Sequence, residues 1–209
     1  ILDSNMQISA VIMSLTMLLP ACDAFVSPRS QPRPASQLLA EKSASMPFLP
    51  KPEGLEGYPG NVDFDPLGVS QWGIPVDYLR EAELKHGRVC MLAITGFIAT
   101  DIGFRLPGEQ HNVPSYLAHD VAVKSGSMTF MFICIALIET VSFVSIQEML
   151  AGSGRKPGDF GLDPLNLVKS QDKLDNMLLK EITHARLAML AFSGLVTQAV
   201  LTENGFPYV

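Results

Sequence analysis

The sequence predicts an all-α membrane protein with three transmembrane helices, of which the first and third are crossed with pseudo-two-fold symmetry. Composition, three apolar stretches and one internal repeat lead to this fold class. Hydrophobic residues make up 47% of the 209 positions and charged residues only 17%, and the mean hydropathy is +0.24, which together favour a membrane protein. A chain of this length forms one domain with additional segments. The net charge of −6 argues against a nucleic-acid partner.

Three apolar stretches are long enough, once their polar ends are included, to cross a hydrocarbon core of about 30 Å. We expect helices over about 77–103, 117–150 and 170–203. The second stretch carries a single charge between residues 125 and 147, at Glu139. Lysine and arginine gather in the segment 151–180, so the positive-inside tendency places this segment and the N-terminus on the same side of the membrane. The first and third helices then run in the same direction.

A repeat of two copies relates the first helix to the third. Glu83-Leu84-Lys85-His86-Gly87-Arg88 returns 98 positions later as Glu181-Ile182-Thr183-His184-Ala185-Arg186. An Asp-Pro-Leu sequence stands 18 positions ahead of each glutamate. Two copies are too few for a solenoid. They match a pair of helices related by an axis along the membrane normal, as in membrane proteins built from parallel repeats.

The charges of the repeat need partners, because an unpaired charge near a bilayer core is costly. Glu83 and Arg88 lie about 140° apart around one helix, which prevents a good pair within that helix. Two-fold geometry predicts exchanged pairs, Glu83 with Arg186 and Glu181 with Arg88. Small residues would let the helices cross closely; these are Gly87, Ala93, Gly96, Ala185, Ala191 and Gly194. The alternative is that the charges anchor each helix independently in the headgroup zone.

The repeated glutamates and histidines are candidate metal ligands. Imidazole binds many metals, and carboxylate oxygen suits Mg²⁺. A lone intramembrane histidine is more often a hydrogen-bonded core residue, but His86 and His184 recur in register beside a neutralised glutamate. Glu-x-x-His on two helices is also half of a di-iron carboxylate site. Glu139 could supply one further iron ligand, whereas no fourth helix supplies the other; a membrane di-iron oxidase is therefore the alternative from another class.

These residues, the two Asp-Pro-Leu loops and the three spans together resemble light-harvesting chlorophyll-binding antenna proteins over roughly residues 55–205. The resemblance implies a non-enzymatic protein that binds chlorophylls and xanthophylls in the plastid thylakoid membrane and transfers excitation energy to a photosystem. The implied partners are other antenna subunits and a photosystem core, with photosystem I slightly favoured. The N-terminus would be stromal. A photoprotective quencher of the same fold is the alternative within the family.

The short loops, the short C-terminal tail and a two-part leader look more like chlorophyll a/c antennae than like those of the green lineage. The implied pigments are chlorophyll a, chlorophyll c and xanthophylls of the fucoxanthin, peridinin or diadinoxanthin type. The implied leader consists of a signal peptide at 1–24 and a transit-peptide-like segment at 25–50, rich in Ser, Pro and Arg. Residues 51–209 form the antenna domain.

The resemblance also implies roles for individual residues. The expected ligands of chlorophyll Mg are Glu83, His86, Glu139, Glu181, His184 and Gln198. His184 stands where green-lineage proteins usually have asparagine, and Thr100, the repeat partner of Gln198, is not expected to ligate. We expect Glu139 to be a ligand and not an acid paired with lysine, because no lysine lies near it in the sequence. The expected carotenoid-end sites are Phe64, Asp65, Pro66 and Leu67, and Leu162, Asp163, Pro164 and Leu165; a plain turn before a helix would also explain each Asp-Pro.

Overall fold

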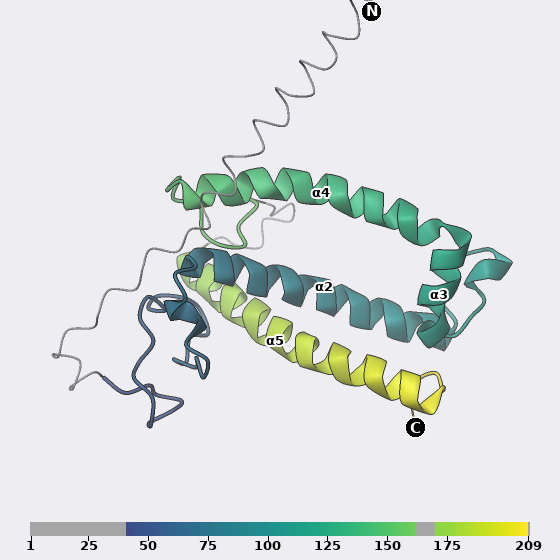
Figure 1. Cartoon of the computed structure of the whole chain (residues 1–209), viewed down its shortest axis with the longest axis horizontal. Helices are drawn as coiled ribbons and strands as arrows, with labels where there is room; N and C mark the ends of the chain where they lie inside the picture. Colours follow the sequence, from purple (N-terminus) through teal and green to yellow (C-terminus); the bar gives the residue numbers. More distant parts are fainter. Residues whose placement is uncertain (1–40, 162–169, 209) are drawn as a thin grey trace, which may run out of the picture.

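The computed structural model describes residues 41–161 and 170–208, and this part of the chain is all-α (Figure 1). Its four α-helices are α2 (Val76–Ile102), α3 (Ser115–Ser125), α4 (Ser127–Leu150) and α5 (Gln171–Thr202). Two short 3-10 helices are η4 (Val69–Gln71), before α2, and η5 (Glu109–His111), before α3. The expected signal peptide and most of the transit-peptide-like segment lie outside the described residues.

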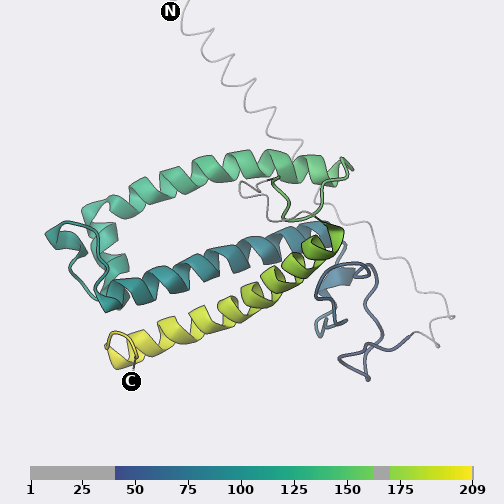
Figure 2. The same ribbon diagram turned by 180° about the vertical axis from the view of Figure 1, so that it is seen from behind.

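Helices α2 and α5 run in the same direction, as both views show (Figures 1 and 2), and their closest contact lies in the N-terminal half of each helix, at Gly87 and Ala185. Their bounds differ from the predicted 77–103 and 170–203 by one residue at each end. The buried core of the crossing consists of Leu84, Ile182 and Ala185. The first two of these occupy the same position in the two copies of the repeat, so the two halves of the repeat pack against each other.

Gly87 lets the two helices touch at this crossing. A Cβ atom at Gly87 would lie only 2.2 Å from the Cβ of Ala185 and 2.9 Å from its Cα, so the backbones are in direct contact. The expectation that Gly96 and Gly194 also serve the close approach is wrong, because nothing lies within 4 Å of a Cβ at either position. The helices diverge beyond the crossing, towards their C-terminal ends (Figure 1).

The single helix predicted over 117–150 is two helices. Gly126 has a φ of +80°, and this left-handed conformation ends α3 and precedes α4. Helix α3 lies at the end of the bundle away from the crossing, between the end of α2 and the start of α4 (Figure 1). The apolar pattern does not reveal this break, because an isolated glycine inside a helical pattern is usually tolerated.

Two described helices, α4 and α5, are long and apolar enough to cross a membrane, with mean hydropathies of 2.1 and 1.4 over their most apolar stretches. Helix α2 does not reach the same combination of length and mean hydropathy. Along α4 only Ser142 and Met149 are buried, and large side chains such as Phe130 and Val141 are about 70% exposed. An apolar surface of this extent suits contact with lipid or with other apolar molecules.

Part of the expected transit-peptide-like segment packs on the loop before α2. Ser43 Oγ donates a hydrogen bond of 2.6 Å to Asp63 O, and Ser45 Oγ donates one of 2.5 Å to Val62 O. Ser43 is also almost fully buried. Residues 41–50 therefore contact the same loop that carries the first Asp-Pro-Leu sequence.

Candidate functional site

Two ion pairs join α2 to α5 at the crossing. Arg88 Nε lies 2.7 Å from Glu181 Oε1, and Arg186 Nε lies 2.7 Å from Glu83 Oε1. Both exchanged pairs expected from the repeat are therefore present in the structure. Each glutamate is neutralised by the opposite helix, so independent anchoring of the charges does not describe the crossing.

Each of these arginines also holds a loop. Arg88 donates from Nη2 to Gly158 O at 2.9 Å, and Arg186 donates from Nη1 to Gly60 O at 2.7 Å. Gly60 and Gly158 are themselves 98 positions apart. Arg88 and Arg186 thus each bind the opposite helix and also the loop that leads into that helix.

Only glycine suits these two loop positions. Gly60 and Gly158 have φ values of +71° and +79°, and a Cβ at either site would lie within 2.8 Å of Ile182 or 2.5 Å of Leu84, respectively. Neither glycine was predicted from the sequence. Extending the comparison at an offset of 98 upstream of the Asp-Pro-Leu loops would have found both, since each follows a proline in its copy.

The two glutamates of the repeat differ in their surroundings. Arg80 Nη1 lies 2.8 Å from Glu83 Oε2, and Arg80 Nη2 donates to Pro59 O at 2.5 Å. The position 98 residues after Arg80 is Leu178, which has no charge. Within the described residues, Glu83 therefore has two arginine partners, whereas Glu181 has one.

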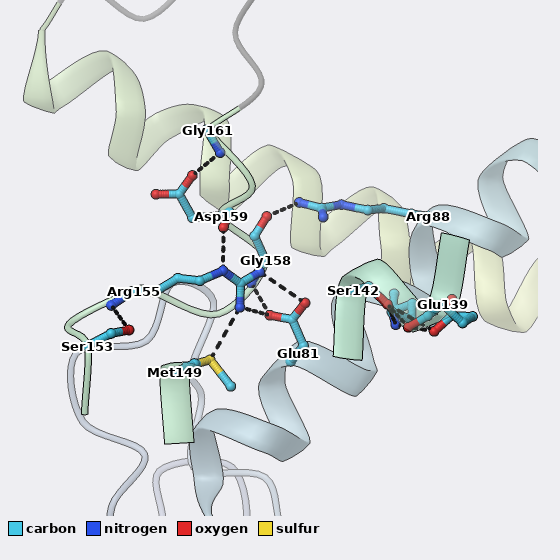
Figure 3. Close-up of polar contacts among 11 residues, drawn as sticks. Glu81, Arg88, Glu139, Ser142, Met149, Ser153, Arg155, Gly158, Asp159 and Gly161 are labelled. Atoms are coloured by element: carbon cyan, nitrogen blue, oxygen red, sulfur yellow. Dashed lines mark hydrogen bonds and ion pairs between the residues drawn. The ribbon is translucent and has the colours of Figure 1, made fainter. Parts of the chain in front are cut away.

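A second buried charge cluster fixes the loop after α4 against α2 (Figure 3). The carboxylate of Glu81 is only 3% exposed and lies 3.3 Å from Arg155 Nη1, and it accepts a hydrogen bond of 2.5 Å from Gly158 N. The Arg155 guanidinium lies 4.6 Å from the centre of the Phe160 ring. The backbone amide and carbonyl of Gly158 are thus bound by Glu81 and Arg88, respectively. No local pattern in the sequence signals a pair between residues 74 positions apart.

Both histidines of the repeat are exposed on the outside of their helices. His86 Nδ1 lies 2.8 Å from Ala82 O, and His184 Nδ1 lies 2.7 Å from Lys180 O. Because a carbonyl oxygen can only accept, Nδ1 carries the proton in each case. The neutral imidazole then has its lone pair on Nε2, which is the form and orientation that a metal-binding histidine requires.

The expectation that Glu139 has no lysine partner is wrong. Lys85 Nζ lies 2.6 Å from Glu139 Oε2. The lysine comes from α2, 54 positions earlier in the chain, so inspection of the residues around Glu139 could not find it. Glu139 is nonetheless an exposed carboxylate on an otherwise apolar part of α4.

Gln198 lies on α5, about 21 Å along the axis from His184 and on nearly the same side of the helix. Its side of α5 is exposed. Its repeat partner, Thr100, donates its hydroxyl to Gly96 O at 2.8 Å within its own helix. At these two positions, which are 98 residues apart, the repeat therefore has different side chains, a threonine on α2 and a glutamine on α5.

The candidate ligands are separate single donors. Across residues 41–161 and 170–208, no three side chains of His, Cys, Asp or Glu are grouped to hold a metal ion. The glutamates that a di-iron site would need at its centre are bound by Arg88 and Arg186 instead. The donor set therefore suits groups that bring their own metal and would take one side-chain ligand each.

The first predicted carotenoid-end loop lines a cavity of about 440 Å³ beside the crossing. Phe64 and Asp65 line this cavity together with Glu83 and Arg186. Pro66 and Leu67 follow in the same loop, and Leu67 is 73% exposed. The second expected loop, Leu162, Asp163, Pro164 and Leu165, lies outside the described residues.

Asp65 organises the turn that leads into η4. Its carboxylate accepts hydrogen bonds from Val69 N at 2.9 Å, Ser70 N at 3.0 Å and Ser70 Oγ at 2.7 Å. Burial alone would raise the pKa of this carboxyl, but the hydrogen bonds from Ser70, Val69 and Gly68 outweigh it and lower the pKa below its ordinary value of 3.8.

This lowered pKa predicts a pH-dependent contribution to stability. The carboxylate of Asp65 stabilises the fold above the unfolded-state pKa, and the contribution is lost as the pH falls through the lower folded-state pKa. We expect Asp65→Asn to reduce stability by about 1 kcal/mol at pH 7. The difference in thermal midpoint between the two proteins should begin to shrink near pH 3.8 and should disappear only below the lower folded-state pKa. Glu53→Gln, at an exposed acid of the same N-terminal segment, is the control; a difference for Asp65→Asn that does not change with pH would contradict the assignment.

Comparison with known proteins gives consistent matches. The family model described as Chlorophyll A-B binding protein matches residues 51–200. Chlorophyll a-b binding protein 6 of Arabidopsis thaliana is 32% identical over 73% of this chain and 66% of its own length. Photosystem I chlorophyll a/b-binding protein 5 of the same plant is 31% identical over 79% of this chain and 73% of its own. A fucoxanthin-chlorophyll a-c binding protein of Chattonella marina var. antiqua is 32% identical over 77% and 75%, respectively. The match thus spans about two thirds to three quarters of the length of these relatives.

Proposed function

Because this chain belongs to the chlorophyll A-B binding protein family, we propose that it is a light-harvesting antenna protein that binds chlorophylls and carotenoids in the thylakoid membrane and passes excitation energy to a photosystem. The observation that carries the proposal is the pair of exchanged ion pairs at the crossing of α2 and α5. They hold two helices rigidly while four other polar side chains, His86, Glu139, His184 and Gln198, remain exposed on apolar helix surfaces.

Helix α2 is proposed as a third transmembrane helix beside α4 and α5, with α2 and α5 related by a pseudo-two-fold axis. Its 27 residues extend about 40 Å. Its charges lie mainly in the N-terminal half, where Arg80, Glu81, Glu83, Lys85 and Arg88 all have ion-pair partners. Paired charges cost far less in a membrane than the hydropathy of α2 alone implies. The contacts of Gly60 and Gly158, which match at the repeat offset, support the axis.

We propose that chlorophyll Mg would be held by Glu83, His86, Glu139, Glu181, His184 and Gln198. Chlorophyll would supply the absorption of light and the transfer of excitation, and the protein would fix the position of each pigment. Nε2 of each histidine is available because Nδ1 is bound to a backbone carbonyl. Oxygen ligands suit Mg²⁺. One basic side chain offsets the charge of Glu181 and another that of Glu139, whereas Glu83 is bound by two arginines.

The loop Phe64, Asp65, Pro66 and Leu67 is proposed to hold one end of a carotenoid. The 440 Å³ cavity that this loop lines next to Arg186 supports the assignment, because it combines apolar walls with a few polar groups. The equivalent loop from Leu162 to Leu165 is proposed for a second carotenoid by the repeat alone.

The pigments are proposed to be chlorophyll a, chlorophyll c and xanthophylls of the fucoxanthin type. Two relatives named as fucoxanthin-chlorophyll a-c binding proteins, from Chattonella marina var. antiqua and Isochrysis galbana, support this choice. Other antenna subunits and a photosystem core are the proposed partners, and the relative named for photosystem I supports photosystem I. The N-terminus is proposed to be stromal, behind a cleaved leader.

Purification tests the proposal directly. The protein should carry chlorophyll and carotenoid, and light absorbed by the carotenoid should appear as chlorophyll fluorescence in an excitation spectrum. We expect His86→Ala to lower the chlorophyll content by about one per chain, because the imidazole that would hold the pigment at that site is removed. His119→Ala, at an exposed histidine of α3, is the control. A colourless protein that contains iron would overturn the proposal.

A further inference from the structure

Helix α4 meets the rest of the protein through few side chains. Only Ser142 and Met149 are buried along its length, and its large apolar residues point outward. Met149 lies at the C-terminal end of the helix, beside the Arg155 cluster. Ser142 is therefore the contact that positions the middle of α4 against α2.

This contact is a polar triad of Lys85, Glu139 and Ser142. Lys85 Nζ donates to Glu139 Oε2 at 2.6 Å and to Ser142 Oγ at 3.0 Å. Ser142 Oγ lies 3.1 Å from both the backbone oxygen and Oε2 of Glu139. One oxygen of the carboxylate is thus bound twice, whereas no donor from the described residues reaches Oε1.

The triad resembles the ion pairs of the crossing, but its carboxylate lies on a third helix, α4. In both cases a basic side chain of one helix binds a single carboxylate oxygen of another helix, as Arg88 does with Glu181 Oε1. The residue 98 positions after Lys85 is Thr183, so the repeat does not supply this third pair. It arises from Lys85 and Glu139 alone.

We propose that Lys85 is a positioning residue that turns Glu139 into a neutral pigment ligand and fixes α4 at the distance from α2 that this site requires. The inference rests on the proposed function, since it assigns a role at one of its pigment sites. A carboxylate that binds a neutral pigment leaves one negative charge in apolar surroundings. The ammonium of Lys85 offsets that charge from the side of Oε2 and leaves Oε1 to face outward to the pigment.

A set of four variants tests the role of the charge. Lys85→Met should remove about one chlorophyll per chain, whereas Lys85→Arg, which keeps the charge, should retain it. The double variant Lys85→Met with Glu139→Gln should recover the chlorophyll, because a neutral amide oxygen ligates without a counter-charge. Lys173→Met, at an exposed lysine of α5, is the matched control and should bind the full set. Full pigment binding by Lys85→Met, or a double variant no better than Lys85→Met, would overturn the proposal.

A second measurement is independent of the pigment. Cys90 on α2 and Cys134 on α4 are free cysteines, and nitroxide labels on them report the separation of the two helices in a background with Cys22→Ser. The distance distribution in detergent should be narrow for the wild type and broader for Lys85→Met. An unchanged distribution would overturn the positioning role. A wild type without any pigment would instead overturn the proposed function, so the two failures are distinguishable.

Discussion

Replacing Gly87 with alanine is expected to disrupt the crossing of α2 and α5. The added methyl group would lie 2.2 Å from the Cβ of Ala185, and backbone atoms of the same residue lie 2.9 and 3.3 Å away. The helices must therefore move apart, which lengthens both exchanged ion pairs. Overpacking of this kind costs about 1–3 kcal/mol, and the better helix propensity of alanine recovers only part of it. Thermal loss of the visible circular dichroism of the bound pigments measures the effect.

Gly96→Ala is the matched control on the same helix. Nothing lies within 4 Å of a Cβ at Gly96, so the change should leave the thermal midpoint unchanged or raise it by the gain in helix propensity, about 0.5–1 kcal/mol. Equal losses of stability for the two variants would show that the crossing does not depend on close contact at Gly87.

Replacing Arg88 with leucine is expected to remove pigments from both α2 and α5. Arg88 is the ion-pair partner of Glu181 among the described residues and also binds Gly158 O. The Arg88 and Glu181 side chains are 34% and 26% exposed, so leaving the Glu181 carboxylate without its partner costs less than the about 3–5 kcal/mol lost from a fully buried pair. Pigment analysis of the purified variant should show losses beyond the site at Glu181, because the crossing itself loosens.

Arg186→Leu is the informative comparison. Glu83 retains Arg80 at 2.8 Å after this change, whereas Glu181 has Leu178 at the equivalent place. We therefore expect Arg186→Leu to cost less stability and fewer pigments than Arg88→Leu. Loss of a single local chlorophyll in Arg88→Leu would contradict the locking role of the exchanged pairs, and a larger effect in Arg186→Leu would contradict compensation by Arg80.

The crossing could be predicted from the sequence because two independent constraints meet there. Helix geometry places Glu83 and Arg88 on different sides of one helix, and the repeat supplies the same unsatisfied charges on a second helix. The small residues were predicted with less success. Sequence gives the positions of Gly87 and Gly96 equally, but the angle between the helices decides which of them lies at the contact.

Other features could not be predicted from the sequence, because they depend on how the helices are arranged in space. The left-handed conformation at Gly126 divides the predicted middle helix, although the apolar pattern continues through it. The partners Lys85 and Glu139, and likewise Glu81 and Arg155, are far apart in the sequence, and neither pair has a counterpart at the offset of 98. Such pairs depend on where α4 and its following loop lie against α2, which local pattern and spacing do not specify.

The long separation of the exchanged pairs sets an order of assembly. Arg88 and Glu181 are 93 positions apart, and Glu83 and Arg186 are 103 apart. During synthesis α2 leaves the ribosome before α5 has been made. The charged residues in the N-terminal half of α2 therefore lack their α5 partners at that stage. Contacts of such range form late in folding. The crossing between α2 and α5 can therefore close only after α5 has been made.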